Sequence, residues 1–204
     1  MKITDKHTRA NAQKTKYEYV KDEVNILKRL HSRYVVKTYE IMETKNECLI
    51  FMELMINNSL ASKINKLDDF KIWKYFRNLI CGVEHCHEIG KIVHRDINVN
   101  NLLISEQDIL KISDFGVSLV IEENNDMIPI NSGPTTYSPP ELKTVENSFY
   151  MGKPADLWCC GVTLYHMIYK TAPFVKNGGL EENNYQYSFF ILVSPYHLNL
   201  VIKR

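Results

Sequence analysis

Four short motifs that carry acidic and amide side chains follow one another between residues 94 and 161. They are His94-Arg95-Asp96 with Asn101 after it, Asp114-Phe115-Gly116, Pro139-Pro140-Glu141, and Asp156 with Trp158 and Gly161. Carboxylate and amide oxygens are the ligands that Mg²⁺ prefers, and a carboxylate also accepts protons. An isolated aspartate is usually a solvated turn residue, and each motif alone is a weak signal. The ordered set is far more specific and indicates a site that performs chemistry.

In this order and at these separations, the motifs resemble the catalytic core of the eukaryotic protein kinases. The resemblance implies phosphoryl transfer from ATP, in which Asp96 orients the substrate hydroxyl and accepts its proton. Asn101 and Asp114 would supply oxygen ligands to the Mg²⁺ that bridges the nucleotide phosphates.

Four other residues of the motifs have roles that the resemblance implies. His94 and Phe115 are expected to stack in the apolar spine that holds the two loops in register. Asp156 is expected to bind the backbone of the loop that carries Asp96. Arg95 is expected to receive an activation-loop phosphate, as in kinases that use one.

The resemblance continues upstream of these motifs. Met1-Lys2-Ile3 matches the end of the third strand of kinases, which makes Lys2 the expected phosphate-anchoring lysine. Its expected ion-pair partner is Glu23 in the following helix. The alternative, that Lys2 is only a charge at a frayed terminus, stays open.

The segment Phe51-Met52-Glu53-Leu54-Met55 resembles the hinge that binds adenine. Met52 is then the gatekeeper, the backbone groups of Glu53 and Met55 face the base, and Leu103 lies beneath it. Any apolar core would also accept Met52 and Leu103, so for these two residues a purely structural role is an open alternative.

Within the kinases, the chain is similar to the calcium/calmodulin-dependent protein kinase kinases and related kinases upstream of the AMP-activated kinase. The segments that carry this similarity are Lys111 to Ser118, Ser138 to Glu141, Phe149 to Lys153 and Gly161 to Tyr165. The similarity implies a protein substrate that is phosphorylated on serine or threonine, ATP and Mg²⁺ as cofactors, and possible regulation by a partner protein.

Hydrophobic periodicity predicts the elements that must position these residues. Helices are expected over Tyr17–Leu30, Asp69–Glu88 and Ala155–Lys170, strands over Val35–Glu43 and Glu47–Leu54, and a long exposed loop over Asn124–Pro140. We therefore expect an α+β, two-lobed, protein-kinase-like fold. The partial kinase domain spans residues 1–174, with a small lobe and hinge over 1–55 and a large lobe over 56–174, and a divergent tail spans 175–204.

Four departures from the family pattern bear on activity. No glycine-rich loop precedes Met1, so we expect a small lobe without its first strands and weak ATP binding. Asn98 stands where serine/threonine kinases carry a lysine that neutralises the transferred phosphate. Pro134 replaces a threonine or serine. The family pattern stops after Phe174, so the last helices of the large lobe are expected to be missing and the apolar tail to cover the exposed surface.

Composition limits the remaining possibilities. Lys and Arg (25) nearly balance Asp and Glu (24), which argues against nucleic-acid or membrane partners. The first residues are polar and unlike a signal peptide, and the five cysteines lack a disulfide framework, so a cytoplasmic location is expected. The cluster Cys81, His85, Cys86 and His87 is a poor metal candidate, because helical spacing turns these side chains apart. A pseudokinase-like binding module and a non-functional kinase fragment are the alternatives to an active kinase.

Overall fold

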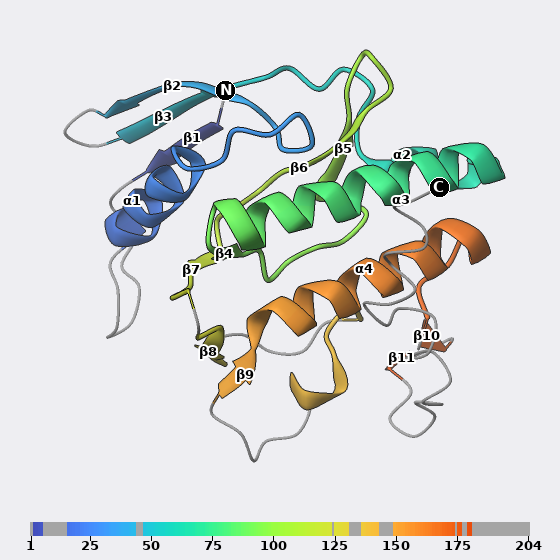
Figure 1. Cartoon of the computed structure of the whole chain (residues 1–204). Coiled ribbons are helices and arrows are strands. Elements are labelled where there is room, and N and C mark those ends of the chain that lie inside the picture. The colour runs from blue at the N-terminus through green and yellow to red at the C-terminus, as the bar shows by residue number, and fades with distance from the viewer. Residues whose placement is uncertain are drawn as a thin grey trace.

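The computed structural model describes residues 2–5, 16–43, 47–123, 125–130, 136–142, 149–173, 175–176 and 179–180 (Figure 1). Pro134, Phe174 and most of the predicted tail lie outside the described residues, so the expected role of the tail stays a prediction. The predicted lobe and domain boundaries also stay predictions. The chain combines helices with separate antiparallel strand pairs, which confirms the predicted α+β class.

The small lobe is a three-stranded antiparallel sheet with one helix. Its strands are β1 (Lys2–Asp5), β2 (Thr38–Glu43) and β3 (Glu47–Met52), in the order β1-β3-β2, and its helix is α1 (Lys16–Leu27). Buried Val20, Val24 and Leu27 on α1 give the predicted apolar face. The strand predicted from Val35 begins at Thr38, because Val35 and Val36 pair instead with Ile112 of the large lobe.

The large lobe is built on two long helices, α3 (Asp69–Glu84) and α4 (Gly152–Tyr169), preceded by the short helices α2 (Leu60–Lys63) and η1 (Ile64–Lys66). Figure 1 shows α3 and α4 lying side by side and running in opposite directions. The Asp68 side chain caps α3 by accepting a hydrogen bond from the Lys71 N–H at 2.8 Å. The predicted helix to Glu88 continues past Glu84 as a wider turn, η2 (His85–Ile89), before Gly90.

The interior of α3 approaches strand β6 (Leu110–Ile112) so closely that a side chain at position 82 would crowd its neighbours. A Cβ on Gly82 would lie 2.8 Å from Ile112 Cδ1 and 3.1 Å from the backbone oxygen of Tyr34. Glycine is normally unfavourable in a helix by about 1 kcal/mol relative to alanine. At this position glycine avoids that crowding, since a methyl group would require both the Ile112 side chain and the backbone at Tyr34 to shift.

Short antiparallel pairs carry the loops of the large lobe. Strand β5 (Leu102–Ile104) pairs with β6, β4 (Ile92–Val93) pairs with β7 (Leu119–Val120), and β10 (Val175–Lys176) pairs with β11 (Gly179–Leu180). A 3-10 turn, η3, covers Pro140–Leu142.

The prediction of a long exposed loop over Asn124–Pro140 is wrong in part. Met127–Pro129 forms strand β8, which pairs with β9 (Phe149–Met151). Ile128 and Tyr150 face each other across this pair and are buried in a second small core with Val93. Strand β8 was not predicted because the segment is polar in composition and because its partner strand lies about twenty residues downstream.

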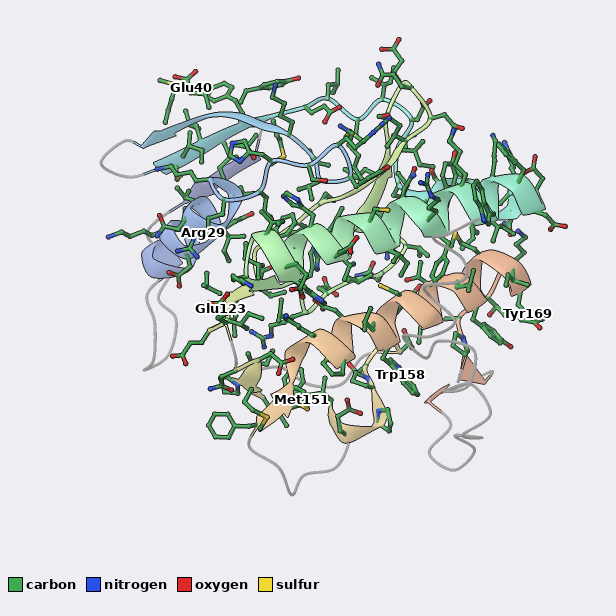
Figure 2. The ribbon with its side chains drawn as sticks, in the orientation of Figure 1. Arg29, Glu40, Glu123, Met151, Trp158 and Tyr169 are labelled. Carbon is green, nitrogen blue, oxygen red and sulfur yellow. The ribbon has the colours of Figure 1, made fainter. Side chains whose placement is uncertain are left out.

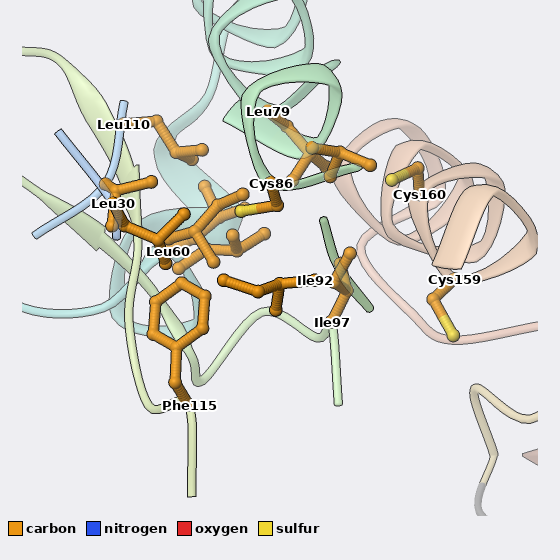
Figure 3. Close-up of a cluster of buried hydrophobic side chains, with 14 of the residues drawn as sticks. Leu30, Leu60, Leu79, Cys86, Ile92, Ile97, Leu110, Phe115, Cys159 and Cys160 are labelled. Atoms are coloured by element: carbon orange, nitrogen blue, oxygen red, sulfur yellow. The ribbon is translucent and has the colours of Figure 1, made fainter. Parts of the chain in front are cut away.

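One continuous apolar core joins the two lobes (Figure 3). It includes Phe115, Leu79, Ile92 and Cys86. All five cysteines carry free thiols, four of them buried, and burial raises the pKa of Cys159 and Cys160 well above the usual value. These thiols therefore behave as small apolar side chains.

None of the helices in the described ranges is long and apolar enough to cross a bilayer.

Candidate active site

Asp96 lies in the connection from β4 to β5, and two amide side chains hold its carboxylate. Asn98 Nδ2 donates to Asp96 Oδ1 at 2.9 Å, and Asn101 Nδ2 donates to Oδ2 at 2.7 Å. Both amides also reach the backbone oxygen of Asp96. A carboxylate has about four acceptor positions, so these two side-chain bonds orient Asp96 and leave acceptor capacity for a substrate hydroxyl.

Asn98 is engaged at both ends of its amide. Its Nδ2 donates to Asp96, and its Oδ1 accepts from the Asn100 N–H at 2.9 Å. Such a local bond from an asparagine side chain to the backbone two residues on is a turn-forming contact. Asn98 therefore supports the conformation of the loop and the orientation of Asp96, and it brings no positive charge.

Asn101 and the segment before Asp114 are joined directly. The Asn101 backbone oxygen accepts from the Ser113 N–H at 2.9 Å and from Ser113 Oγ at 2.8 Å. Because a carboxylate only accepts, the Asn101 Nδ2 faces Asp96 and its Oδ1 lies on the other arm of the amide. Asp114 is exposed. One amide oxygen and one exposed carboxylate, placed on neighbouring strand ends, fit the ligand preference of Mg²⁺.

His94 and Phe115 hold the two loops together, as predicted. Their ring centroids lie 4.8 Å apart at an interplanar angle of 66°, and both side chains are at most 2% exposed. His94 Nδ1 accepts from the Asp96 N–H at 3.2 Å, so Nε2 carries the proton and donates to the Ser113 oxygen at 3.1 Å. The His94 ring therefore links Ser113, the residue before Asp114, to the backbone of Asp96.

Asp156 ties α4 to the catalytic loop, which confirms the prediction for this residue. The side chain is 1% exposed; its Oδ2 accepts from the His94 N–H at 2.8 Å and its Oδ1 from the Arg95 N–H at 2.9 Å. His87 Nε2 lies 2.8 Å from the same Oδ2. Sequence reasoning missed this third partner and weighed His87 only as a metal ligand, because 69 positions separate the pair. Among the described residues, no three His, Cys, Asp or Glu side chains lie close enough to hold a metal ion together.

Arg95 donates to two groups, one just after Asp114-Phe115-Gly116 and one in β9. Its Nε donates to the Tyr150 hydroxyl at 3.2 Å and its Nη1 to the Val117 oxygen at 3.1 Å. Burial raises the pKa of Tyr150, against the opposing effect of Arg95, so the hydroxyl stays protonated. Sequence reasoning missed Tyr150. The expected contact of Arg95 with a phosphate stays a prediction, and much of the segment that would carry one lies outside the described residues.

The expected hinge connects β3 to the large lobe. Met52 and Leu103 are half-buried, and Met52 packs against the main core. The Glu53 N–H donates to the Lys37 oxygen at 2.8 Å, and the Glu53 carboxylate lies 2.8 and 2.6 Å from Lys111 Nζ. Within the part of the chain that the structure describes, no backbone bond uses the Glu53 oxygen or the Met55 N–H. These are the two groups expected to face adenine, a role that stays a prediction.

Lys2 and Glu23 lie on adjacent elements. Lys2 is in β1, opposite Ile50 of β3, and β1 contacts α1, which carries Glu23. Glu23 is 6% exposed, so its carboxylate is buried and needs a polar partner. The side chain of Lys2 lies outside the described side chains, so the ion pair stays a prediction.

Comparison with known proteins agrees with this geometry. The family profile described as "Protein kinase domain" matches residues 1–198. A calcium/calmodulin-dependent protein kinase kinase of Caenorhabditis elegans is 38% identical over 165 residues, 78% of this chain and 30% of that protein. CBL-interacting serine/threonine-protein kinase 8 of Arabidopsis thaliana is 34% identical over 177 residues, 85% of this chain and 39% of that protein.

A carbon catabolite-derepressing protein kinase of Candida glabrata is 33% identical over 158 residues, 76% of this chain and 25% of that protein. The chain therefore spans well under half the length of these three relatives. The expected resemblance to the calcium/calmodulin-dependent protein kinase kinases is confirmed. With its catalytic loop, its stacked histidine and phenylalanine and its anchoring aspartate in place, the chain belongs to the protein kinase family.

Proposed function

We propose that this chain transfers the γ-phosphoryl group of ATP to a serine or threonine hydroxyl of a protein substrate. The observation that carries the proposal is the arrangement around Asp96. Two neutral amides orient its carboxylate, and one of them belongs to Asn101, whose backbone is bonded to the residue before Asp114. The similarity to a serine/threonine-protein kinase of Arabidopsis thaliana supports serine and threonine as acceptors.

Each residue has a distinct part in the proposed reaction. Mg²⁺, held by Asn101 and Asp114, would supply positive charge to the phosphates of ATP. Asp96 accepts the hydrogen bond of the substrate hydroxyl and then its proton, at the oxygens that the two amides hold in place. Lys2, paired with Glu23, would anchor the nucleotide phosphates.

The nucleotide base would lie against the hinge. The Glu53 oxygen would accept from the exocyclic amine of adenine, and the Met55 N–H would donate to the ring. Met52 and Leu103, both half-buried, would give the base apolar contacts on two sides. The ion pair with Lys111 holds the Glu53 side chain against β6.

A pair of substitutions separates binding from transfer. Wild-type protein with Mg²⁺ and ATP should melt at a higher temperature than without them, because a ligand that binds only the folded state stabilises it. Asp114→Ala should lose both the shift and phosphate transfer. Asp96→Asn should keep the shift and lose transfer by about 10²–10⁴-fold, the usual contribution of a positioned base. Transfer is measured with labelled ATP and a mixed serine/threonine peptide library.

Two results would count against the proposal. The absence of any melting shift for wild type at millimolar ATP would remove the nucleotide site. A shift without transfer in wild type would favour the alternative, a partner-binding module that has kept the kinase fold. Asn98 is the observation that favours this alternative, because it supplies no charge to the transferred phosphate.

The substitution Asn98→Lys tests whether the missing charge at position 98 limits phosphate transfer. A lysine could still donate to Asp96 and would add a cation beside the reacting phosphate. We expect transfer to rise by up to about 10²-fold, since one transition-state donor is commonly worth 10²–10³ in rate. No gain, with the fold intact, would mean that Asn98 is not what limits transfer.

Two further parts of the proposal concern cellular context. The relatives named CBL-interacting kinases suggest that a regulatory protein contacts this chain as well. The five free thiols fit a reducing compartment, and we place the protein in the cytoplasm on that basis.

A further inference from the structure

A pocket of about 620 Å³ opens on the small lobe, between the end of α1 and strand β2. None of the residues assigned above to catalysis, nucleotide binding or metal binding lines it. Its walls come from the last turn of α1, the connection from α1 to β2, the first residues of β2, and Lys111 of β6. Its volume lies within the usual range of about 300–1,000 Å³ for binding sites.

The lining of this pocket is strongly positive. Four cationic side chains line it, together with His31 and the single carboxylate of Glu40; the four are Lys28, Arg33, Lys37 and Lys111. The whole chain has a net charge of only +1, so the excess is local. Lys111 is already neutralised by Glu53, at 2.6 Å.

The other three cations remain available to a ligand. Among the described residues, Lys28, Arg33 and Lys37 form no ion pair. All three are exposed. Arg33 and Lys37 instead lie over tyrosine rings, at 5.6 Å and 5.3 Å from the ring centroids. Each contact holds a charge at the mouth of the pocket, where it attracts anions.

The interior and the surroundings of the pocket are apolar. Buried Leu27 and Leu30 and half-buried Ile41 line it. Tyr39, which also lines the pocket, is 63% exposed and adds apolar surface at its edge. Figure 2 shows Glu40, the next residue in sequence, at the outer edge of the small-lobe sheet. A pocket that follows several consecutive residues of a strand, with apolar and cationic side chains in its lining, suits a segment of polypeptide better than a small molecule.

We propose that this pocket binds an acidic peptide segment of a partner protein. An apolar side chain of the segment enters against Leu27 and Leu30, and flanking carboxylates contact Arg33 and Lys37. The charges favour encounter and orientation, and the apolar contact supplies most of the affinity. The proposal stands on the lining of the pocket alone and does not require that the chain transfers phosphate.

Fluorescence anisotropy on the full chain tests the proposal, with two labelled peptides as probes. One alternates glutamate and leucine, and the other alternates lysine and leucine. The acidic peptide should bind, and Arg33→Glu with Lys37→Glu should weaken it by about tenfold, since each reversal removes one attraction and adds one repulsion. Tyr39→Ser should weaken it severalfold at both low and high salt, because that contact is apolar.

The matched control reverses two exposed lysines outside the pocket, Lys21→Glu with Lys66→Glu. It changes the net charge equally and should leave binding within about twofold. An equal loss in the control, equal binding of the basic peptide, or no binding of the acidic peptide would each overturn the proposal. Binding to phosphatidylserine vesicles without binding to the acidic peptide would also overturn it, in favour of a membrane surface.

Discussion

The bonds of Asp156 make Asp156→Asn a sharp test of how the catalytic loop is held. Asparagine has the same shape but only one acceptor oxygen, whereas Asp156 accepts from the His94 N–H, the Arg95 N–H and His87 with two oxygens. At least one buried donor must then face an NH₂ group. The lost charge-assisted bond is worth about 1.5–3 kcal/mol and the unsatisfied donor about 1–3 kcal/mol.

Together these terms reduce the free energy of unfolding by about 3–5 kcal/mol, the range expected when one partner of a buried charged group is removed. For a chain of this length, 1 kcal/mol corresponds to about 2–4 °C, so the melting temperature should fall by about 6–20 °C. Thermal melts followed by circular dichroism measure the change. Hydrogen exchange should show that the amides of His94 and Arg95 lose protection first.

Glu106→Gln is the matched control, because it removes one carboxylate from an exposed turn. It should move the melting temperature by no more than about 2 °C. A change of similar size for Asp156→Asn, with the two loop amides still protected, would refute the view that this side chain holds the loop.

Three further substitutions test other contacts. Gly82→Ala should destabilise the fold by about 1–2 kcal/mol in denaturant melts, since overpacking against a backbone oxygen costs about 1–3 kcal/mol and exceeds the gain in helix propensity; a more stable variant would contradict the close approach. Tyr150→Phe should cost about 0.5–1.5 kcal/mol through the lost bond from Arg95, and equal stability would show that this bond contributes nothing. Burial lowers the pKa of His166, so the folded state resists its protonation. Its stabilising contribution is complete above the unfolded pKa of about 6.5 and is lost as pH falls below it, so melting temperature should drop from about pH 7 to about pH 5, and less so in His166→Gln.

The sequence was sufficient to predict a structural feature where the residues that determine it are close in sequence or repeat along one helix or strand. The apolar face of α1 and the start of α3 at Asp69 follow from spacing and composition. The bonds of Asp156 to the catalytic loop and the stacking of His94 on Phe115 were predictable only because the motifs occur together in order. Neither contact follows from helix or strand propensity.

Contacts between distant residues with no motif were not predictable. His87 meets Asp156 across 69 positions, and Lys111 meets Glu53 across 58. In each case the sequence shows an ordinary charged or titratable side chain on a helix or strand, and only the packing of elements selects its partner. Strand β8 was missed for the same reason, since its pairing with β9 is not encoded within either segment.

The structure also explains why the catalytic loop needs so many supports. Arg95 and Asp114 both adopt left-handed backbone conformations, with φ of 72° and 62°, which side-chain-bearing residues rarely occupy. Each such conformation costs about 1–3 kcal/mol and persists only when its surroundings hold it. Asp156 holds Arg95 through its N–H, and the stack of His94 on Phe115 holds the segment that contains Asp114. The contacts of Asp156 and of the His94–Phe115 pair therefore offset the strain at these two positions, and changes in these contacts should lower both phosphate transfer and the stability of the fold.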